Sequence, residues 1–188
     1  MIVEELEVNA DILNDFLEHL KIRKCSFLGY SAGGITSFFF AAKYPEKVEK
    51  LILTSTNPFL TQQQVKYFKS IRDISKWEQQ TRENLIEQYG VEYLTSMWES
   101  YIDNLDNVAK KYTQEFMKPI FNKIEAETLI LYGDKDPFTP KNFMEFMTEN
   151  IKRSKLVVYP GGRHNLHNHK VDDFNKKIAE FILTRSKI

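Results

Sequence analysis

Three of the seven glycines in this chain lie within six residues, in the stretch 29–34 (GYSAGG) that surrounds Ser31. The apolar run 25–28 precedes this stretch and predicts a short buried strand, and residues 35–42 follow it with a pattern that predicts a helix. Gly-x-Ser-x-Gly between a strand and a helix is typical of a nucleophile elbow, a strained turn that exposes the serine hydroxyl. The alternative is a loose turn that contains a serine by chance, since ordinary sequences contain about 7% glycine.

The turn around Ser31 makes two demands on its neighbours. Gly29 and Gly33, two residues to either side, are expected to lack side chains because a Cβ there would clash with the strand or the helix. The helix begins next to the serine, so its first backbone N–H groups and its positive dipole end face a developing oxyanion. We assign the backbone N–H of Ala32 to that role.

Apolar runs and amphipathic patterns alternate along most of the chain. This alternation predicts an α/β fold with a parallel sheet. Strands are expected at residues 25–28, 50–54, 128–132 and 156–159, and helices over 9–20, over 35–42, from about 140, and over 171–182. The first helix is expected to be capped by Asn9 and to carry one apolar stripe, made of Ile12, Leu13, Phe16, Leu17 and Leu20.

Residues 58–120 interrupt this alternation. They contain no strand-like run, several helical patterns and many Tyr, Trp, Met and Phe residues. They follow the carboxyl end of a strand, the edge at which open α/β sheets bind ligands. We therefore expect a helical lid over a pocket, and the alternative is a helical subdomain with a core of its own. The expected division is a first core part over 1–57, the lid over 58–120 and a second core part over 121–188.

The composition excludes several classes of protein. The 26 Lys and Arg residues equal the 26 Asp and Glu residues in number, so no net field favours nucleic acid or an anionic membrane. Apolar runs such as 38–42 are too short to span a bilayer. The single cysteine, Cys25, cannot form an internal disulfide. We expect a soluble protein without nucleic-acid or membrane partners.

A serine needs a base and an orienting acid to become nucleophilic at neutral pH, and after a nucleophile elbow these follow in the order Ser, Asp or Glu, His. After the third expected strand, residues 132–137 (YGDKDP) offer Asp136 as the acid, with Asp134 as a rival that would otherwise stabilise the turn. After the fourth, residues 160–164 (PGGRH) offer His164 as the base. Six of the seven glycines lie in the three loops that carry these residues, which favours one shared site.

The other histidines are expected to have no catalytic role. His167 and His169 lie beyond the glycine turn and are expected at the surface or at the start of a helix. Three neighbouring histidines also raise the alternative of a metal site, but this spacing lacks supporting carboxylates. His19, on the first helix, is expected to be solvated. We expect neither a metal nor a cofactor.

With these motifs the chain resembles the α/β-hydrolase superfamily over its whole length, and within it the biphenyl hydrolase-like (valacyclovir hydrolase) family of serine hydrolases of α-amino-acid esters. The segment 71–77 (IRDISKW) is the most discriminating match, because lids vary greatly among these hydrolases. Carried over residue by residue, the resemblance implies Ser31 as the nucleophile, Asp136 as the acid and His164 as the base. The other matching segments are 33–36, 41–45, 133–137 and 163–167.

Two departures from that family bear on function. The family carries an aspartate directly after the nucleophile, where it meets the α-amino group of the substrate, and Ala32 in its place implies a weaker preference for α-amino esters. The family's nucleophile follows the fifth strand, whereas Ser31 follows the first expected one, and nothing like His-Gly-Gly occurs upstream. We therefore expect the C-terminal part of an α/β-hydrolase sheet, from the nucleophile strand onward, in an N-terminally truncated chain with a helical lid insertion.

Two functions are compatible with these residues. The first is hydrolysis of small-molecule carboxylic esters, with small apolar or aminoacyl acyl groups, through an acyl-enzyme on Ser31. The second is an impaired remnant with ester turnover close to background, which acts as an interaction module and self-associates through the exposed strand edge Cys25–Leu28. We expect an intracellular protein, and the resemblance is also compatible with a mitochondrial one.

Overall fold

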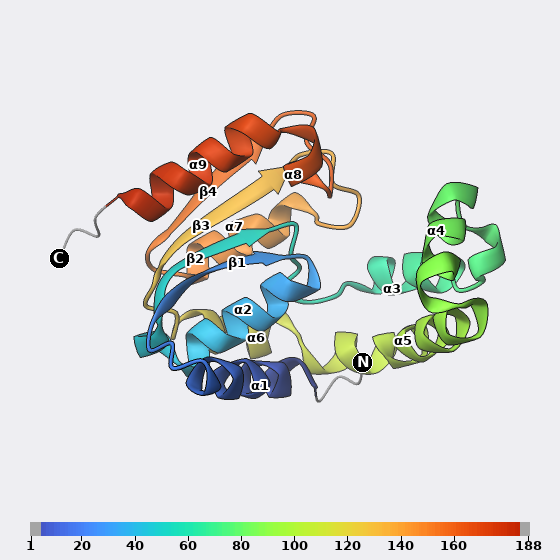
Figure 1. The fold of residues 1–188 in the computed structure, drawn as a ribbon, viewed down its shortest axis with the longest axis horizontal. Helices are drawn as coiled ribbons and strands as arrows, with labels where there is room; N and C mark the ends of the chain where they lie inside the picture. The colour runs from blue at the N-terminus through green and yellow to red at the C-terminus, as the bar shows by residue number, and fades with distance from the viewer. Residues whose placement is uncertain (1–4, 185–188) are drawn as a thin grey trace. The chain divides into compact units, whose positions relative to one another are not determined.

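The computed structural model describes residues 5–184 (Figure 1). It divides the chain into two compact units, a smaller one made mainly of residues 59–113 and a larger one that contains most of the remaining described residues. The predicted α/β fold is confirmed, since the larger unit is built on a four-stranded parallel sheet flanked by helices. Within residues 5–184, no helix is both long enough and apolar enough to cross a membrane.

All four predicted strands are present, each two residues longer than expected, and they lie in the sheet in chain order. The strands are β1 (Cys25–Tyr30), β2 (Val48–Thr54), β3 (Glu127–Gly133) and β4 (Ser154–Tyr159). The helices of this unit are α1 (Glu5–His19), α2 (Ala32–Lys43), the 3-10 turn η1 (Pro45–Lys47), α6 (Gln114–Phe121), α7 (Lys141–Asn150), α8 (Leu166–His169) and α9 (Val171–Leu183). Because every strand runs the same way, the loops that follow the strands gather at one end of the sheet.

Helices cover both faces of the sheet, and β2 and β3 are accordingly buried along almost their whole length. On the face covered by α9, Ile52 and Leu131 pack with Phe174 of that helix. On the other face, the ring of Phe38 on α2 lies 5.0 Å from that of Phe121 on α6. The segment α6, which falls inside the predicted insertion 58–120, therefore contributes to the core of the larger unit.

The first helix differs from the prediction in its start, and most of its predicted apolar stripe is exposed. The prediction that Asn9 caps it is wrong, because α1 begins at Glu5 and residues 5–8 are already helical. Of the predicted apolar stripe, Leu17 is buried and Leu13 is half-buried, whereas the other three residues are exposed. The helix is instead held to α2 by polar groups: Asp11 accepts hydrogen bonds from Lys43 at 2.8 Å and from the Tyr44 hydroxyl at 2.6 Å.

The smaller unit is entirely helical, as predicted for this part of the chain. It contains α3 (Gln62–Ser70), the 3-10 turn η2 (Ile74–Lys76), α4 (Gln79–Tyr89) and α5 (Val91–Lys111). Val65, Ile102 and Leu105 form its buried centre, and aromatic side chains such as Trp98 pack against them. The unit thus has a core of its own, and its role as a lid stays a prediction.

Candidate active site

Ser31 occupies a sharp turn at the end of β1, as the glycine-rich stretch predicts. β1 ends at Tyr30 and α2 begins at Ala32, so the chain changes from strand to helix at this one residue. Ser31 has φ +51° and ψ −121°, and such a conformation in a non-glycine residue costs about 1–3 kcal/mol. Its backbone N–H donates to the Thr54 carbonyl at 3.1 Å, which ties the turn to β2.

The predicted demand for glycine is met at Gly29 but not at Gly33. A Cβ on Gly29 would lie 2.6 Å from the Cα of Gly34, so strand and helix meet there without room for a side chain. A Cβ on Gly33 would meet nothing within 4 Å, so that part of the prediction is wrong. The confined residue on the helix side is Gly34, where a Cβ would lie 2.5 Å from the Oγ1 of Thr56.

The structure brings the three predicted side chains together at the carboxyl end of the sheet. His164, in the loop between β4 and α8, places Nε2 3.3 Å from Ser31 Oγ. Its Nδ1 lies 2.9 Å from Asp136 Oδ2, in the loop after β3. The Asp136 side chain has no exposed surface, and its Oδ1 accepts the Phe138 N–H at 2.9 Å. A hydroxyl, an imidazole and a buried carboxylate therefore lie in hydrogen-bonded series.

Asp134, the rival acid, has a different contact. Its side chain is exposed, and Oδ1 accepts the backbone N–H of Gly161 at 2.7 Å. This bond joins the loop after β3 to the loop that carries His164. Asp136 therefore contacts the imidazole of His164. Asp134 instead stabilises the loop after β3, which is the other role that the sequence allowed for it.

The imidazole of His164 is enclosed by aromatic rings. The ring of Tyr30 lies 5.3 Å from it, and the ring of Phe138 lies 5.1 Å from it at a steep angle. The Tyr30 hydroxyl donates to the side-chain oxygen of Asn165. Burial, with a smaller contribution from the charge of Asp136, raises the pKa of Tyr30, so this phenol stays protonated and able to donate at neutral pH.

The remaining histidines have other surroundings than the Ser31–His164–Asp136 series, although His167 shares a neighbouring ring with it. His167, on α8, packs its ring 4.8 Å from that of Tyr30. His169 is exposed, and His19 is exposed as predicted. Across residues 5–184, no group of three His, Cys, Asp or Glu side chains is arranged to hold a metal ion.

Two hydroxyl side chains at the end of β2 were missed by the sequence reasoning. Ser55 Oγ donates to the His164 carbonyl at 2.6 Å, and Thr56 Oγ1 donates to the Ser31 carbonyl at 2.7 Å. Both residues are buried, and Ser55 also has a positive φ of +51°. The available signal was the run of three hydroxyl residues, 54–56, where an apolar strand ends.

Ala32 is the first residue of α2, directly after the serine turn. Its N–H is at the first helical position, where a helix offers no acceptor of its own, and an N–H group at a helix start can donate to an anion. The position of Ala32 is therefore compatible with the predicted oxyanion role. Its methyl side chain offers no carboxylate to a substrate amine.

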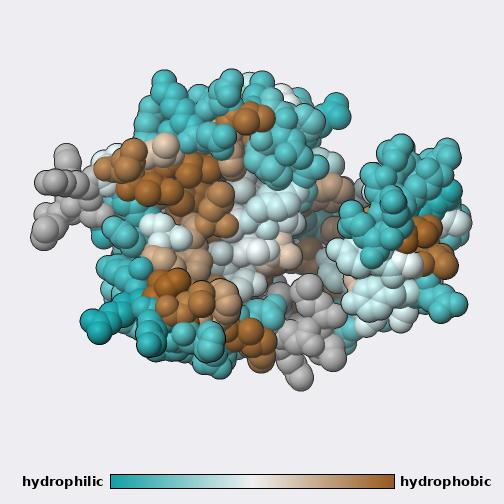
Figure 2. Space-filling model, viewed as in Figure 1, coloured by the Kyte–Doolittle hydropathy of each residue, from teal (hydrophilic) through white to brown (hydrophobic). Residues whose placement is uncertain are grey.

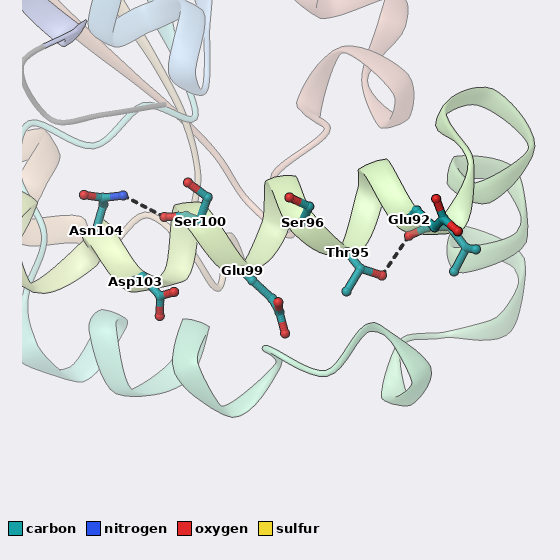
Figure 3. Close-up of a pocket in the computed structure, with 8 residues that line it drawn as sticks. Glu92, Thr95, Ser96, Glu99, Ser100, Asp103 and Asn104 are labelled. Carbon is teal, nitrogen blue, oxygen red and sulfur yellow. Dashed lines mark hydrogen bonds between the residues drawn. The ribbon is translucent and has the colours of Figure 1, made fainter.

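A separate hollow of about 660 Å³ lies along α5 of the smaller unit (Figure 3). Its lining residues carry carboxylates and hydroxyls but no histidine. The Thr95 hydroxyl donates to the Val91 carbonyl, and the Asn104 amide donates to the Ser100 carbonyl, both at 2.8 Å. These side chains bind their own helix, and the hollow holds no pair of nucleophile and base.

Two family models match the chain. The one described as "alpha/beta hydrolase fold" matches residues 4–88, and the one described as "TAP-like protein" matches residues 106–187. Among solved structures, an α/β hydrolase enzyme from a deep-sea metagenome library of the Medee basin superposes with a TM-score of 0.70. That comparison has 19% identity and covers 95% of this chain and 72% of the other.

Curated relatives are also hydrolases. Serine hydrolase BPHL of Mus musculus is 32% identical over 168 residues, and that of Homo sapiens is 33% identical over 168 residues. Each match covers 89% of this chain and 58% of the relative, so the chain spans 58% of their length. A 2-hydroxy-6-oxononadienedioate/2-hydroxy-6-oxononatrienedioate hydrolase of Escherichia coli is 27% identical, over 94% of this chain and 68% of its own length.

Proposed function

We propose that the chain is a serine hydrolase of the α/β-hydrolase superfamily, which cleaves carboxylic esters through an acyl-enzyme on Ser31. The observation that carries the proposal is the hydrogen-bonded series Ser31–His164–Asp136. The 3.3 Å contact between Ser31 Oγ and His164 Nε2 is slightly longer than the usual range of about 2.6–3.2 Å, as is common for such pairs without substrate.

In the proposed acylation step, Ser31 Oγ attacks the ester carbonyl carbon while His164 Nε2 accepts the hydroxyl proton. The backbone N–H of Ala32 donates to the oxyanion of the tetrahedral intermediate. Asp136 accepts the Nδ1–H of His164 and so holds the tautomer whose Nε2 can accept a proton. When the intermediate collapses, the alkoxide takes the proton from His164 and leaves as an alcohol.

Water then removes the acyl group from Ser31. His164 accepts a proton from a water molecule, whose oxygen attacks the acyl carbon. The second tetrahedral intermediate collapses, Ser31 Oγ recovers a proton from His164, and the carboxylic acid leaves. One ester and one water molecule give one alcohol and one acid, without a change of oxidation state.

The proposed substrates are a class of esters, defined by what their acyl group needs to contain. Two of the relatives are named serine hydrolases, and the sequence resembles a family that acts on α-amino-acid esters. Ala32 offers no carboxylate beside the nucleophile, so we propose carboxylic esters without a required α-amino group. Similar hydrolysis rates for a valyl ester and its des-amino analogue would support this choice, and a large preference for the amine would oppose it.

The direct test is covalent labelling of Ser31. It requires only that the serine reacts once with a reagent, and it does not depend on complete catalytic turnover. The purified chain is treated with a fluorophosphonate, which reacts with activated serines, and the modified residue is located by peptide mass spectrometry. We expect stoichiometric modification of Ser31 that is lost in a His164→Ala variant, because the serine is activated by its base. Labelling spread over several serines, or equal labelling of the His164→Ala variant, would reject the proposal.

A second candidate function, an interaction module, is favoured by the exposed apolar surface of α1 and β1. Val8, Ile12 and Phe16 on α1, and Leu20 just after it, follow one another at four-residue spacing and are 46%, 60%, 55% and 47% exposed. The apolar stripe of this helix thus faces outward while its polar side contacts α2. Figure 2 shows apolar surface at the lower left, where α1 and β1 lie in Figure 1.

The outer edge of β1 continues this surface. Among the described residues, β1 is an end strand of the sheet, and it carries neither a charged residue nor a proline that would discourage pairing. Leu28 on β1 is 52% exposed, and Ile22 just before the strand is 38% exposed. With the four residues of the α1 stripe and its end, these make six roughly half-exposed side chains, on the order of 500 Å² of apolar area, the upper end of a monomer's largest patch.

We propose that a second copy of the chain covers this surface, in a two-fold arrangement. Two such patches together would bury on the order of 1,000 Å², about the area that a specific interface needs. A Phe16→Glu substitution is expected to weaken the association at least about tenfold, because each copy would bury a charge. Ile182→Glu, at an apolar position on α9 that is 43% exposed, is the control and should leave the mass unchanged. Sedimentation equilibrium that gives a monomer for the unaltered chain, or equal masses for both variants, would contradict the arrangement.

A further inference from the structure

We propose that Ser55 and Thr56 are positioning residues, whose two adjacent hydroxyls fix the distance between the nucleophile turn and the loop that carries the base. Both are buried, at 2% and 1% exposure, at the carboxyl end of β2. Ser55 Oγ donates to the His164 carbonyl at 2.6 Å, and Thr56 Oγ1 donates to the Ser31 carbonyl at 2.7 Å. The inference rests on the proposed function, since it concerns how the same site is assembled.

The topology shows why such a link matters. Ser31 follows β1 and His164 follows β4, and these strands lie at opposite edges of the described sheet. The loops that follow them therefore meet across the ends of β2 and β3. No ladder of strand hydrogen bonds sets the 3.3 Å between Ser31 Oγ and His164 Nε2.

Contacts at the end of β2 hold the nucleophile turn from two directions. The Ser31 N–H donates to the Thr54 carbonyl at 3.1 Å, and the Ser31 carbonyl accepts from Thr56. Thr56 also fills the space beside Gly34, where a Cβ would lie 2.5 Å from Thr56 Oγ1. The position of the turn is therefore set by Thr56 as much as by β1.

The base loop is held by the neighbouring residue. The side chain of His164 is bound at Nδ1 by Asp136, and its backbone carbonyl is bound by Ser55. Ser55 keeps a positive φ of +51° while making this bond, a conformation that persists only where the surroundings impose it. Residues 55 and 56 are consecutive in the chain, and one binds the base loop while the other binds the nucleophile turn. A shift of one loop relative to the other would therefore break at least one of the two bonds.

If these hydroxyls only stabilised the fold, their loss would leave the distance between Ser31 and His164 unchanged. The test must therefore separate an effect on this distance from an effect on the stability of the protein. A displacement of about 1 Å in a reacting group can lower the rate about 10²-fold while substrate binding is retained. We therefore expect Thr56→Val, which keeps the shape of the side chain but loses the donor, to lower kcat about 10-fold to 100-fold with KM within about twofold. Thr56→Ser keeps the donor and should stay within about threefold of the unaltered chain.

Ser55 is tested with Ser55→Gly, which removes the CH₂OH side chain and with it the donor, because glycine accepts the positive φ that would strain an alanine. We expect a fall in kcat about as large as that of Thr56→Val, again with little change in KM. Hydrolysis of a p-nitrophenyl ester supplies the kinetic constants, and the melting temperature of each variant shows how much folded protein the assay contains.

A measurement on the free protein tests the positioning role independently of ester hydrolysis. The Nδ1–H proton of His164, hydrogen-bonded to Asp136, is followed by downfield proton NMR in the free protein. We expect this resonance to shift or broaden in Ser55→Gly and to stay in place in Thr56→Ser. An unchanged resonance in Ser55→Gly, or an equal kcat for Thr56→Val and Thr56→Ser, would overturn the positioning role even if Ser31 is labelled. If the unaltered chain hydrolyses no ester, the resonance alone decides the inference.

Discussion

Replacing Ser31 by alanine is expected to lower the rate of ester hydrolysis by at least about 10³-fold. In a triad with a complete oxyanion hole, loss of the serine lowers kcat on the order of 10⁶-fold. Each missing oxyanion donor lowers kcat by about 10²–10³-fold, and Ala32 supplies the one donor that we assign among the described residues. Even a site that works with this donor alone should therefore depend strongly on Ser31.

The measurement is the initial rate of p-nitrophenyl ester hydrolysis by the purified variant and by the unaltered chain. Ser37→Ala is the control, because Ser37 is a nearby serine on α2, the helix that follows Ser31; it is buried, and its hydroxyl donates to the Gly33 carbonyl at 2.7 Å. That control should keep the rate within about threefold. A Ser31→Ala variant that retains a tenth of the rate would show that the hydrolysis has another source.

The parts of the site that follow strands in the sequence could be predicted because their signals are local. An apolar run, a glycine-rich turn and a helix pattern placed Ser31 at the end of β1, and turn residues after two later runs placed Asp136 and His164. Parallel strands bring such loops to one end of a sheet, so the convergence of these residues followed from the fold class.

The contacts that the sequence did not reveal are long-range. Ser55 and Thr56 acquire their partners 109 and 25 residues away, and neither hydroxyl belongs to a motif. The confinement of Gly34 likewise depends on Thr56, which is why spacing alone pointed to Gly33 instead. Contacts that depend on how one loop packs against another are not encoded in the pattern of either loop.

The orientation of α1 could not be predicted from its sequence for a related reason. An apolar stripe normally marks the face of a helix that packs on a core. In α1, Lys47 binds Asn14 and Glu18 on the polar side, so ion pairs with the end of α2 and with η1 set the orientation instead. Periodicity identified the helix correctly but could not show which of its faces this unit covers.

The second large effect is expected from Asp136, with Asp134 as its internal control. Asp136→Asn keeps the size of the side chain but can present an N–H₂ group to His164, which favours the tautomer whose Nε2 carries the proton and cannot act as a base. In a serine hydrolase with a complete triad, loss of the aspartate lowers kcat about 10⁴-fold, less than loss of the serine. We expect a fall on the order of 10²-fold or more here, and always smaller than that of Ser31→Ala.

Asp134→Asn changes the same chemical group two residues away and should keep the rate within about threefold. The amide oxygen of asparagine can still accept the Gly161 N–H, and neutral acceptors replace exposed carboxylates in such turns with an effect of about 1 kcal/mol or less on stability. Both variants are assayed with the p-nitrophenyl ester and checked for folding by their melting temperature. If Asp134→Asn loses the larger share of the rate while Asp136→Asn keeps it, the carboxylate that orients His164 during the reaction is the other one, and the loop after β3 must rearrange when substrate binds.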